Sequence, residues 1–237
     1  MKIIIASLCA IGASAFAPSS NNVKTTSLNA VNWQPDQSAF AYGLPGSLDP
    51  APEFDPLGLA KDQSLETLKK WREAETQHGR VAMLAFIGLL ITEEPIAFHP
   101  LFEVNEKDIG PAIRHLDEVR ATTPIFFEIF ALFIGALEVN RALIGWKSPD
   151  EAKFQELNDE YYPGDVNFDP LGLKPDDAEE FFEMSTKEIQ HGRVAMLATA
   201  GIIAQELTNG KEIFVNLGLT ADKFDPSSVP LQFGSVV

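Results

Sequence analysis

The sequence contains the same nine-residue segment twice, and this internal repeat constrains the fold more than any other feature. The segment QHGRVAMLA at 77–85 recurs without change at 190–198, which is 113 residues later. At the same offset Glu75 is matched by Glu188, so each copy begins with the pattern E-x-x-H-G-R. Consecutive identities at a fixed distance indicate a duplication, which predicts two structurally equivalent elements.

A second, shorter repeat precedes each copy of the first. The segment F-D-P-L-G-L occurs at 54–59 and again at 168–173. Because Asp, Pro and Gly are typical of turns, each half is predicted to be a loop followed by a helix. Plain turn chemistry before a helix also accounts for this motif. We expect the two repeated helices at about 65–92 and 177–207.

A third helix is expected between the repeats, at 124–145. Pro124 suits a first helical turn, and Glu128 is the only charged residue from there to position 137. The repeated helices have uncharged cores at 81–91 and 194–204 only, too short for about 30 Å of hydrocarbon at about 1.5 Å per residue. They span a membrane if the E-x-x-H-G-R turns lie in it too. The prediction is an all-α membrane protein with three transmembrane helices.

The charges of the repeated motif are predicted to neutralise one another. With three spans the first and third helices are parallel, and the duplication becomes a pseudo-two-fold axis along the membrane normal. Symmetry then places Glu75 near Arg193 and Glu188 near Arg80, since each Arg side chain leans back toward its helix N-terminus. Unpaired charges are costly in lipid, so we expect two crossed helices joined by reciprocal ion pairs.

Each motif also carries a histidine, His78 or His191, one turn after its glutamate. At about 100° per residue, Glu75, His78 and Ala82 fall on one side of the first helix, and the third helix repeats this. A neutral imidazole beside small residues suits the axial position of a magnesium ion in a flat tetrapyrrole, which needs a single protein ligand. Small residues at this spacing are equally typical of close helix packing.

The middle helix has its own ligand candidate. Glu138 and Arg141 form an i, i+3 pair, which on an exposed helix is an ordinary surface ion pair. Within an apolar span we favour a neutralised magnesium ligand. Glu128 is interpreted as an interfacial residue. His115 and His99 lie in the preceding loop and are further candidates, although most loop histidines are simply solvated.

Residues 1–30 have the composition of a leader. A charged start, an apolar run and small residues at 12–15 are typical of a secretory signal, and the hydroxyl-rich stretch that follows, with no acidic residue before Asp36, is typical of a plastid transit peptide. A single signal peptide before an irregular mature start is the alternative. Removal of the leader leaves a mature domain of 31–237.

Composition excludes two classes of protein. The chain has 34 acidic and 18 basic residues and a formal net charge of −16, whereas nucleic-acid phosphates need clustered Lys and Arg. The one cysteine, Cys9, lies in the leader. The mature chain is therefore expected to have neither a disulfide nor a thiolate metal site.

The motifs quoted above resemble those of the light-harvesting chlorophyll a/b- and a/c-binding superfamily. The similarity runs from about 54 to 205, and the duplicated E-x-x-H-G-R-V-A-M-L is among the most specific signatures of that superfamily. The leader, with A-S-A-F-A-P at 13–18, resembles the bipartite targeting sequences of algae with secondary plastids. Together these features are most similar to the fucoxanthin chlorophyll a/c-binding proteins of diatoms and related algae.

The resemblance implies a set of pigment-binding residues. The chlorophyll ligands would be Glu75, His78, Glu138, Glu188, His191 and Gln205, with Arg80, Arg193 and Arg141 as ion-pair partners of the glutamates. The pigments would be chlorophyll a, chlorophyll c and fucoxanthin or related carotenoids, the carotenoids capped by the F-D-P-L-G-L loops. Two family sites are in question, because Phe130 replaces a glutamine of the plant members unless Glu128 substitutes for it, and no histidine follows His191.

The resemblance also implies a role: a thylakoid antenna that passes excitation to a photosystem and catalyses no reaction. Its partners would be a photosystem core, other antenna proteins and thylakoid lipid, and the R-E-A-E segment at 72–75 favours photosystem I. Photoprotective quenching by the same fold is one alternative. A di-iron carboxylate bundle is another, since E-x-x-H helices occur there. That bundle needs four long helices, and Arg80 and Arg193 would add positive charge beside its metals.

Overall fold

The fold is known from a computed structural model of the chain, which describes residues 33–93, 95–96, 98, 111–148 and 155–221. These residues form helices and loops, with one isolated extended bridge between Trp146 and Leu157. The elements are η1 (Phe40–Gly43), α2 (Leu65–Thr92), η2 (Ala112–Arg114), α3 (His115–Thr122), α4 (Phe126–Gly145), α5 (Ala178–Asn209) and α6 (Ile213–Asn216). The expected leader at 1–30 and the candidate His99 lie outside the described residues.

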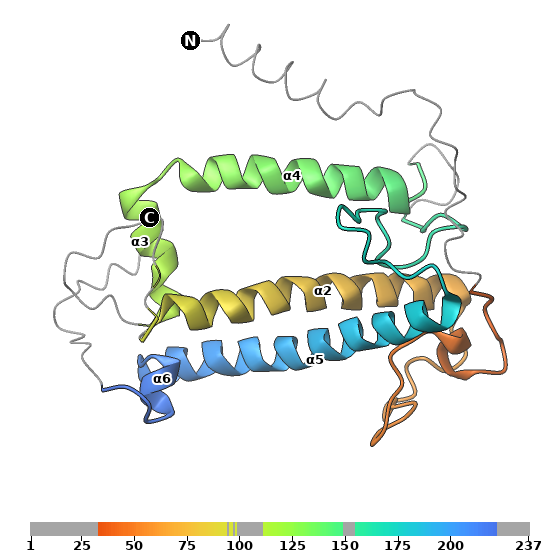
Figure 1. Cartoon of the computed structure of the whole chain (residues 1–237), viewed down its shortest axis with the longest axis horizontal. Coiled ribbons are helices and arrows are strands. Elements are labelled where there is room, and N and C mark those ends of the chain that lie inside the picture. The colour runs from red at the N-terminus through yellow and green to blue at the C-terminus, as the bar shows by residue number, and fades with distance from the viewer. Residues whose placement is uncertain (1–32, 94, 97, 99–110, 149–154, 222–237) are drawn as a thin grey trace, which may run out of the picture.

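The two repeated helices, α2 and α5, run side by side in the same direction (Figure 1). Side-chain caps define where they begin: the Ser64 hydroxyl accepts from the N–H of Thr67, and the Asp177 carboxylate accepts from the first N–H groups of α5. Such caps satisfy backbone donors that have no partner inside the helix. The F-D-P-L-G-L loops that precede the caps are closed by Asp55 and Asp169, whose carboxylates accept backbone N–H groups four and five residues ahead.

The backbones of α2 and α5 touch at one pair of glycines. A Cβ built on Gly79 would lie 3.0 Å from Cα of Gly192, and a Cβ on Gly192 would lie 2.9 Å from Cα of Gly79. Ala82 and Ala195, one turn further on, are buried in the same interface. Ala82 lies one turn after His78 and three residues after Gly79, so it borders both the histidine and the glycine contact. These small residues serve close helix packing.

Helix α4 stands apart from the other two long helices (Figure 1). Every residue from 128 to 140 is exposed, although most are apolar, and the side chains of Leu132 and Leu143 are 74% and 77% exposed. The described contacts of α4 lie near its ends: α3 is at one end, and the 155–165 loop and α2, through the Arg141–Glu73 pair, are at the other. An apolar surface this large on one helix indicates a surface that is covered by something else.

The length and hydropathy of a helix decide whether it alone could cross a membrane. In the described part of the chain no single helix is both long and apolar enough to cross a membrane. The segments 112–122 and 126–145 are long and apolar enough only when taken together, and the chain bends by 109° between them.

The end of the helix pair opposite to the E-x-x-H-G-R motifs is closed by two buried carboxylates. Glu93, directly after α2, accepts the backbone N–H of Ile213 in α6 at 2.8 Å. Glu206, in the last turn of α5, accepts the N–H of Ile113 in η2 at 2.9 Å. Each carboxylate therefore holds the short helix that follows the other long helix. Positions 93 and 206 are separated by 113 residues, the offset of the repeat.

Candidate functional site

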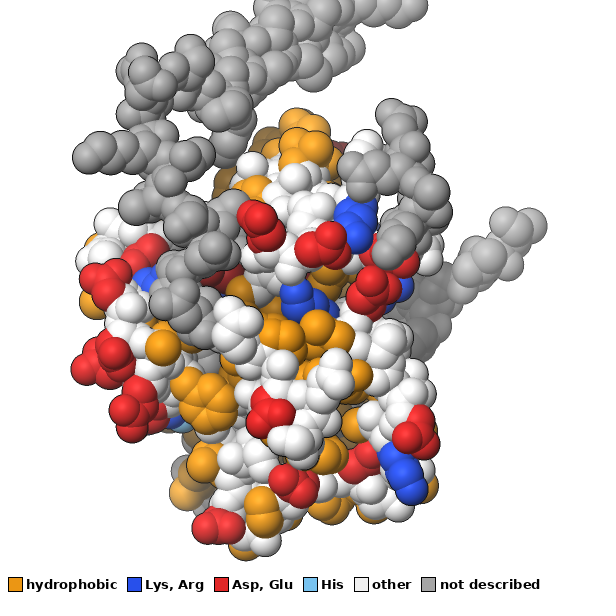
Figure 2. Space-filling model, turned by 90° about the vertical axis from the view of Figure 1, so that its right-hand side faces the viewer, with side chains coloured by type: hydrophobic (Ala, Val, Ile, Leu, Met, Phe, Trp, Pro, Cys, Tyr) orange, Lys and Arg blue, Asp and Glu red, His pale blue; other side chains and the backbone are white. Residues whose placement is uncertain are grey.

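The two E-x-x-H-G-R motifs meet in the N-terminal halves of α2 and α5, about three turns in from the end where these helices begin. Nε of Arg80 lies 2.7 Å from Oε1 of Glu188, and Nε of Arg193 lies 2.7 Å from Oε1 of Glu75. The structure thus brings together both pairs expected from the sequence, one in each direction across the glycine contact. Figure 2 shows the molecule from this end, where basic side chains lie among acidic and hydrophobic ones.

Each of these arginines also binds the loop that precedes the opposite helix. Nη1 of Arg80 donates to the carbonyl oxygen of Gly164 at 2.8 Å, and Nη1 of Arg193 donates to that of Gly46 at 2.6 Å. Both glycines have positive φ values, +88° and +111°, which disfavour a residue with a side chain. A Cβ on Gly164 would also lie 2.9 Å from Cγ2 of Thr76. Glycine is therefore required at both positions for the loops to reach the guanidinium groups.

The two histidines present one ring nitrogen to the outside. Nδ1 of His78 lies 2.7 Å from the carbonyl oxygen of Ala74, and Nδ1 of His191 lies 2.8 Å from that of Lys187. A carbonyl only accepts, so Nδ1 is the protonated nitrogen and Nε2 of the neutral ring keeps its lone pair. Both residues are exposed. Each imidazole is therefore oriented to offer a single nitrogen ligand.

The two motif glutamates differ in their charge partners. Glu75 is contacted by Arg193 and also by Arg72 of its own helix, whose Nη1 lies 3.2 Å from Oε2. Glu188 has Arg80 as its ion-pair partner, through Oε1. Both side chains remain about one-third exposed, at 29% and 36%. Since a carboxylate has more acceptor positions than these contacts occupy, both can offer an oxygen to a metal ion.

On α4, Glu138 and Arg141 form the predicted i, i+3 ion pair, with Nη1 of Arg141 2.6 Å from Oε2 of Glu138. The same guanidinium contacts a second carboxylate, because its Nε lies 3.0 Å from Oε1 of Glu73 on α2. Glu73 is buried, and its Oε2 accepts the hydroxyl of Tyr161 at 3.1 Å and the N–H of Gly164 at 2.6 Å. Burial, together with the charge of Glu73, raises the pKa of Tyr161, which keeps that hydroxyl protonated.

Glu73 was missed by the sequence analysis, although the repeat contains a signal that identifies it. The residue 113 positions later is Thr186, so this buried glutamate has no counterpart in the second half. Position 73 thus differs between the two halves, as do its neighbours at 72 and 74. Here that position joins α2 to α4.

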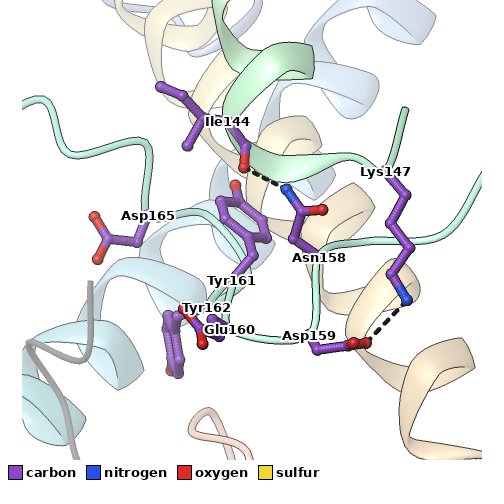
Figure 3. Close-up of a pocket in the computed structure, with 8 residues that line it drawn as sticks. All are labelled: Ile144, Lys147, Asn158, Asp159, Glu160, Tyr161, Tyr162 and Asp165. Carbon is purple, nitrogen blue, oxygen red and sulfur yellow. Dashed lines mark hydrogen bonds and ion pairs between the residues drawn. The ribbon is translucent and has the colours of Figure 1, made fainter. Parts of the chain in front are cut away.

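The loop that holds Tyr161 also clamps the end of α4. Figure 3 shows Asn158 donating to the carbonyl oxygen of Ile144 in the last turn of α4, at 2.9 Å, and Lys147 paired with Asp159, also at 2.9 Å. These residues line a cavity of about 410 Å³ between the loop and the helix end. The loop therefore determines where α4 ends and connects it to the arginine network.

The remaining candidates lie apart from these contacts. Gln205 is exposed on α5, and Glu128 is exposed on α4. His115 is the first residue of α3 and is partly exposed. Phe130, at the position of the missing glutamine, stacks on Phe126 with ring centroids 5.5 Å apart. Among the described residues there is no group of three or more His, Cys, Asp or Glu that could hold a metal ion.

The arrangement suits metal ions that need one protein ligand each. The candidate donors are separate from one another, and apolar side chains flank them: Val81, Leu84, Val194 and Leu197 are between 66% and 77% exposed. A hydrated magnesium ion prefers several oxygen ligands and would not favour such surroundings. A magnesium ion already held in an apolar macrocycle would fit them, because Glu75, His78, Glu188 and His191 could each supply the one protein ligand that such an ion needs.

Comparison with known proteins agrees with this chemistry. The family model described as "Chlorophyll A-B binding protein" matches residues 40–207. Light-harvesting complex stress-related protein 1 of Chlamydomonas reinhardtii is 42% identical over 189 residues, covering 79% of this chain and 74% of that protein. The fucoxanthin-chlorophyll a-c binding protein of Isochrysis galbana is 44% identical over 174 residues, 72% and 79% of the two chains. Chlorophyll a-b binding protein 4 of Arabidopsis thaliana is 32% identical over 196 residues, 78% and 71% of the two chains.

The family model covers more than half of the chain, and relatives above 30% identity cover more than two thirds of it. These matches confirm the resemblance found in the duplicated motif. The chain belongs to the chlorophyll a-b binding protein family.

Proposed function

We propose that this protein is a light-harvesting antenna that binds chlorophyll a, chlorophyll c and fucoxanthin or related carotenoids and passes excitation energy to a photosystem. The observation that carries the proposal is the pair of reciprocal Glu–Arg contacts, which neutralise charge while leaving a glutamate oxygen and an imidazole nitrogen available on each helix. The names of the relatives support the choice of pigments, since several are fucoxanthin-chlorophyll a-c binding proteins.

The proposed membrane arrangement has three spans. We assign them to 75–91 in α2, to α4, and to 188–204 in α5, with the two repeated helices related by a pseudo-two-fold axis along the membrane normal. At about 1.5 Å per residue the repeated spans are about 26 Å long, close to the hydrocarbon thickness of a bilayer. Two observations support this arrangement: the charged turn of each motif is neutralised, and α4 is apolar and exposed along its length. The membrane would be the plastid thylakoid, reached after removal of 1–30 to leave 31–237.

Within this arrangement the chain positions pigments and performs no bond chemistry. The proposed magnesium ligands are Glu75, His78, Glu138, Glu188, His191 and Gln205, with His115 as a further candidate and Arg80, Arg141 and Arg193 as the charge partners. A bound chlorophyll supplies the light absorption. The protein holds each magnesium at one side-chain atom, keeps the ligand oriented through its ion pair and excludes water with apolar neighbours. Partners would be a photosystem core, with the R-E-A-E segment favouring photosystem I, other antenna proteins and thylakoid lipid.

The test is replacement of both histidines by leucine, followed by reconstitution with chlorophyll and carotenoid. We expect the H78L/H191L protein to bind about two chlorophylls fewer per polypeptide than the unaltered chain, because each imidazole supplies the one axial ligand of its pigment. The measurement is pigment content per polypeptide after purification. Gln77→Leu, which removes a polar side chain next to His78, serves as the control. An unchanged chlorophyll content in H78L/H191L would remove both histidines from the ligand set.

Photoprotective quenching is the second candidate function. It is favoured by 42% identity to stress-related proteins of Chlamydomonas reinhardtii, which is as high as the identity to most of the other relatives compared. The two functions differ in how excitation lifetime depends on pH. A chlorophyll fluorescence lifetime of the pigmented protein that shortens on acidification supports quenching, and a lifetime that does not change supports harvesting alone.

A further inference from the structure

We propose that Glu73 is a positioning residue for the pigment site on α4. It takes one edge of the Arg141 guanidinium, so that Glu138 keeps an oxygen free and a net negative charge as a magnesium ligand. This inference rests on the proposed function, because it gives a role to a residue that supports one of the proposed pigment ligands.

The first step is the division of one guanidinium between two carboxylates. Arg141 contacts Glu73 through Nε and Glu138 through Nη1, at 3.0 and 2.6 Å. An isolated arginine and carboxylate favour a two-point contact in which both carboxylate oxygens are engaged. Because Glu73 occupies the Nε edge, Glu138 is contacted at Oε2 only. Its Oε1, on a side chain that is 56% exposed, is the atom available to a pigment.

The second step is the rigidity of Glu73 itself. Its side chain is 1% exposed, and its second oxygen is held by the hydroxyl of Tyr161 and the N–H of Gly164. The carboxylate is thus held by two donors in addition to Arg141. Since α4 is exposed along 128–140 and has few other contacts, the Arg141 contact limits rotation of α4 about its own axis. The direction in which Glu138 points depends on that rotation.

The third step is the charge balance at the three proposed glutamate ligands. Glu75 has two arginine partners and its group sums to +1, while Glu188 has one and sums to zero. Glu138 shares its single arginine with Glu73, so that group sums to −1. A ligand in the negative group donates more strongly to magnesium, and its field acts on the nearest pigment in a low-dielectric surrounding. The pigment at Glu138 is therefore expected to absorb at an energy set in part by Glu73.

The repeat supplies a matched control position. Thr186 occupies the place of Glu73 in α5, and its buried hydroxyl has no hydrogen-bond partner in the described structure. Thr186→Val removes this hydroxyl without changing charge or any ion pair. A general disturbance of a buried position in this turn would appear in both variants, whereas an effect on Glu138 would appear only after substitution of Glu73.

The experiment compares E73Q, E138L, the double variant and T186V after reconstitution with pigment. We expect E73Q to lose, or to shift in absorption, the same single chlorophyll band that E138L removes. The double variant should lose no more chlorophyll than E138L alone, because Glu73 acts through that one site. T186V should keep the pigment content and spectrum of the unaltered chain. Pigment content per polypeptide and difference absorption spectra are the readouts.

Three outcomes overturn the inference and are distinguishable. If E138L loses one chlorophyll while E73Q matches the unaltered protein, Glu73 does not position the ligand, and the proposed function stands. If E73Q loses pigment from several sites and adds to the loss in E138L, Glu73 is a general fold residue. If E138L keeps every pigment, the α4 ligand assignment fails together with this inference.

A milder variant covers the case in which E73Q does not assemble. Tyr161→Phe removes one donor from Glu73 and leaves Arg141 and both carboxylates in place. We expect the chlorophyll content to be unchanged and the band assigned through E138L to shift. A spectrum identical to that of the unaltered protein would count against the positioning role.

Discussion

The α2–α5 pair has two regions in which charged residues of one half contact the other half, and the two regions differ in which charges meet. At the E-x-x-H-G-R motifs, in the N-terminal half of each helix, each half gives an arginine to the glutamate of the other half, so opposite charges meet. At the far end each half gives a carboxylate, and Glu93 and Glu206 meet each other as well as the short helices. A duplicated chain brings residues near the axis against their own copies, so a charged residue there meets the same charge. Such a contact requires a proton.

The far end accordingly holds a carboxyl group with a raised pKa. The proposed spans end at positions 91 and 204, and Glu206 lies beyond them. Burial, and then the neighbouring Glu93, raises the pKa of Glu206 to about 8, against the opposing hydrogen bond from Ile113. A raised carboxyl pKa means that the folded state keeps a proton that the unfolded chain releases above about pH 4.5. The stabilisation is complete below that pH and is lost as pH rises toward 8.

The largest effect is expected when the opposite-charge end is broken. Arg80→Leu leaves Glu188 without its ion-pair partner and releases the Gly164 loop, so we expect a loss of about 3–5 kcal/mol. Arg193→Leu should cost less, because Arg72 still contacts Glu75. The measurement is the free energy of unfolding of the pigmented protein in denaturant. Equal losses in the two variants would show that the second arginine gives Glu75 no protection.

The second largest loss of stability is expected at the contact between Gly79 and Gly192, which lies between the two Glu–Arg pairs. Gly79→Ala places a Cβ 3.0 Å from the backbone of Gly192 and forces the helices apart, at a cost of about 2–3 kcal/mol. Gly88→Ala in the same helix is the control, since nothing lies within 4 Å of its Cβ and helix propensity alone favours alanine. Both are measured by the unfolding midpoint. A G79A protein as stable as G88A would mean that this crossing does not set the helix separation.

A smaller effect of the opposite sign is expected at the like-charge end. Glu206→Gln cannot ionise, so at pH 8 and above it should be more stable than the unaltered protein by at least about 1.4 kcal/mol, which is what a single unit of pKa shift is worth. Near pH 4.5 the folded protein keeps Glu206 protonated and therefore uncharged, like the amide of the variant. The difference in unfolding free energy should then vanish. Unfolding free energies across this pH range test the sign. A difference in unfolding free energy that is the same at all pH values would argue against a raised pKa of Glu206.

The smallest effect is expected where the two halves differ. Thr186→Val replaces a buried hydroxyl that lacks a partner among the described residues with a methyl group of similar size. We expect a gain in unfolding free energy of about 0.5–1 kcal/mol, because the penalty of an unsatisfied buried group is removed. Thermal unfolding of T186V beside the unaltered chain is the measurement. A loss of stability would indicate that the hydroxyl has a bonded partner in solution.

The sequence predicted the repeated helices and the contacts between their motifs because the duplication carries that information. The observed ends of α2, α4 and α5 lie within two residues of the ranges read from apolar patterning. The Glu–Arg contacts followed from symmetry and side-chain direction alone. The burial of Ala82 depends on the crossing geometry at Gly79, which local periodicity does not contain, so the sequence left its role open between pigment contact and helix packing.

Residues that join unrelated segments were beyond the reach of periodicity. Glu73 contacts α4 and a loop about 90 residues away, and no local pattern encodes a contact of that separation. Glu93 and Glu206 lie outside the identical nine-residue segments, so the sequence analysis did not extend the repeat to them. Comparison of both halves at the 113-residue offset beyond the identical segments pairs Glu93 with Glu206 and sets Glu73 against Thr186. Contacts between elements follow from such comparison more readily than from hydropathy.

The exposed middle of α4 has a consequence for how the protein reaches its final form. Helix α4 has contacts near its two ends and exposed apolar side chains between them. It therefore lacks most of the buried apolar contacts that ordinarily make folding cooperative. On our proposal, bound pigment and lipid provide these contacts, so completion of the fold depends on how much pigment and lipid is present. Unfolding would then become harder as free ligand rises, by mass action. Accumulation of the polypeptide in a cell would report how much pigment is available to complete it.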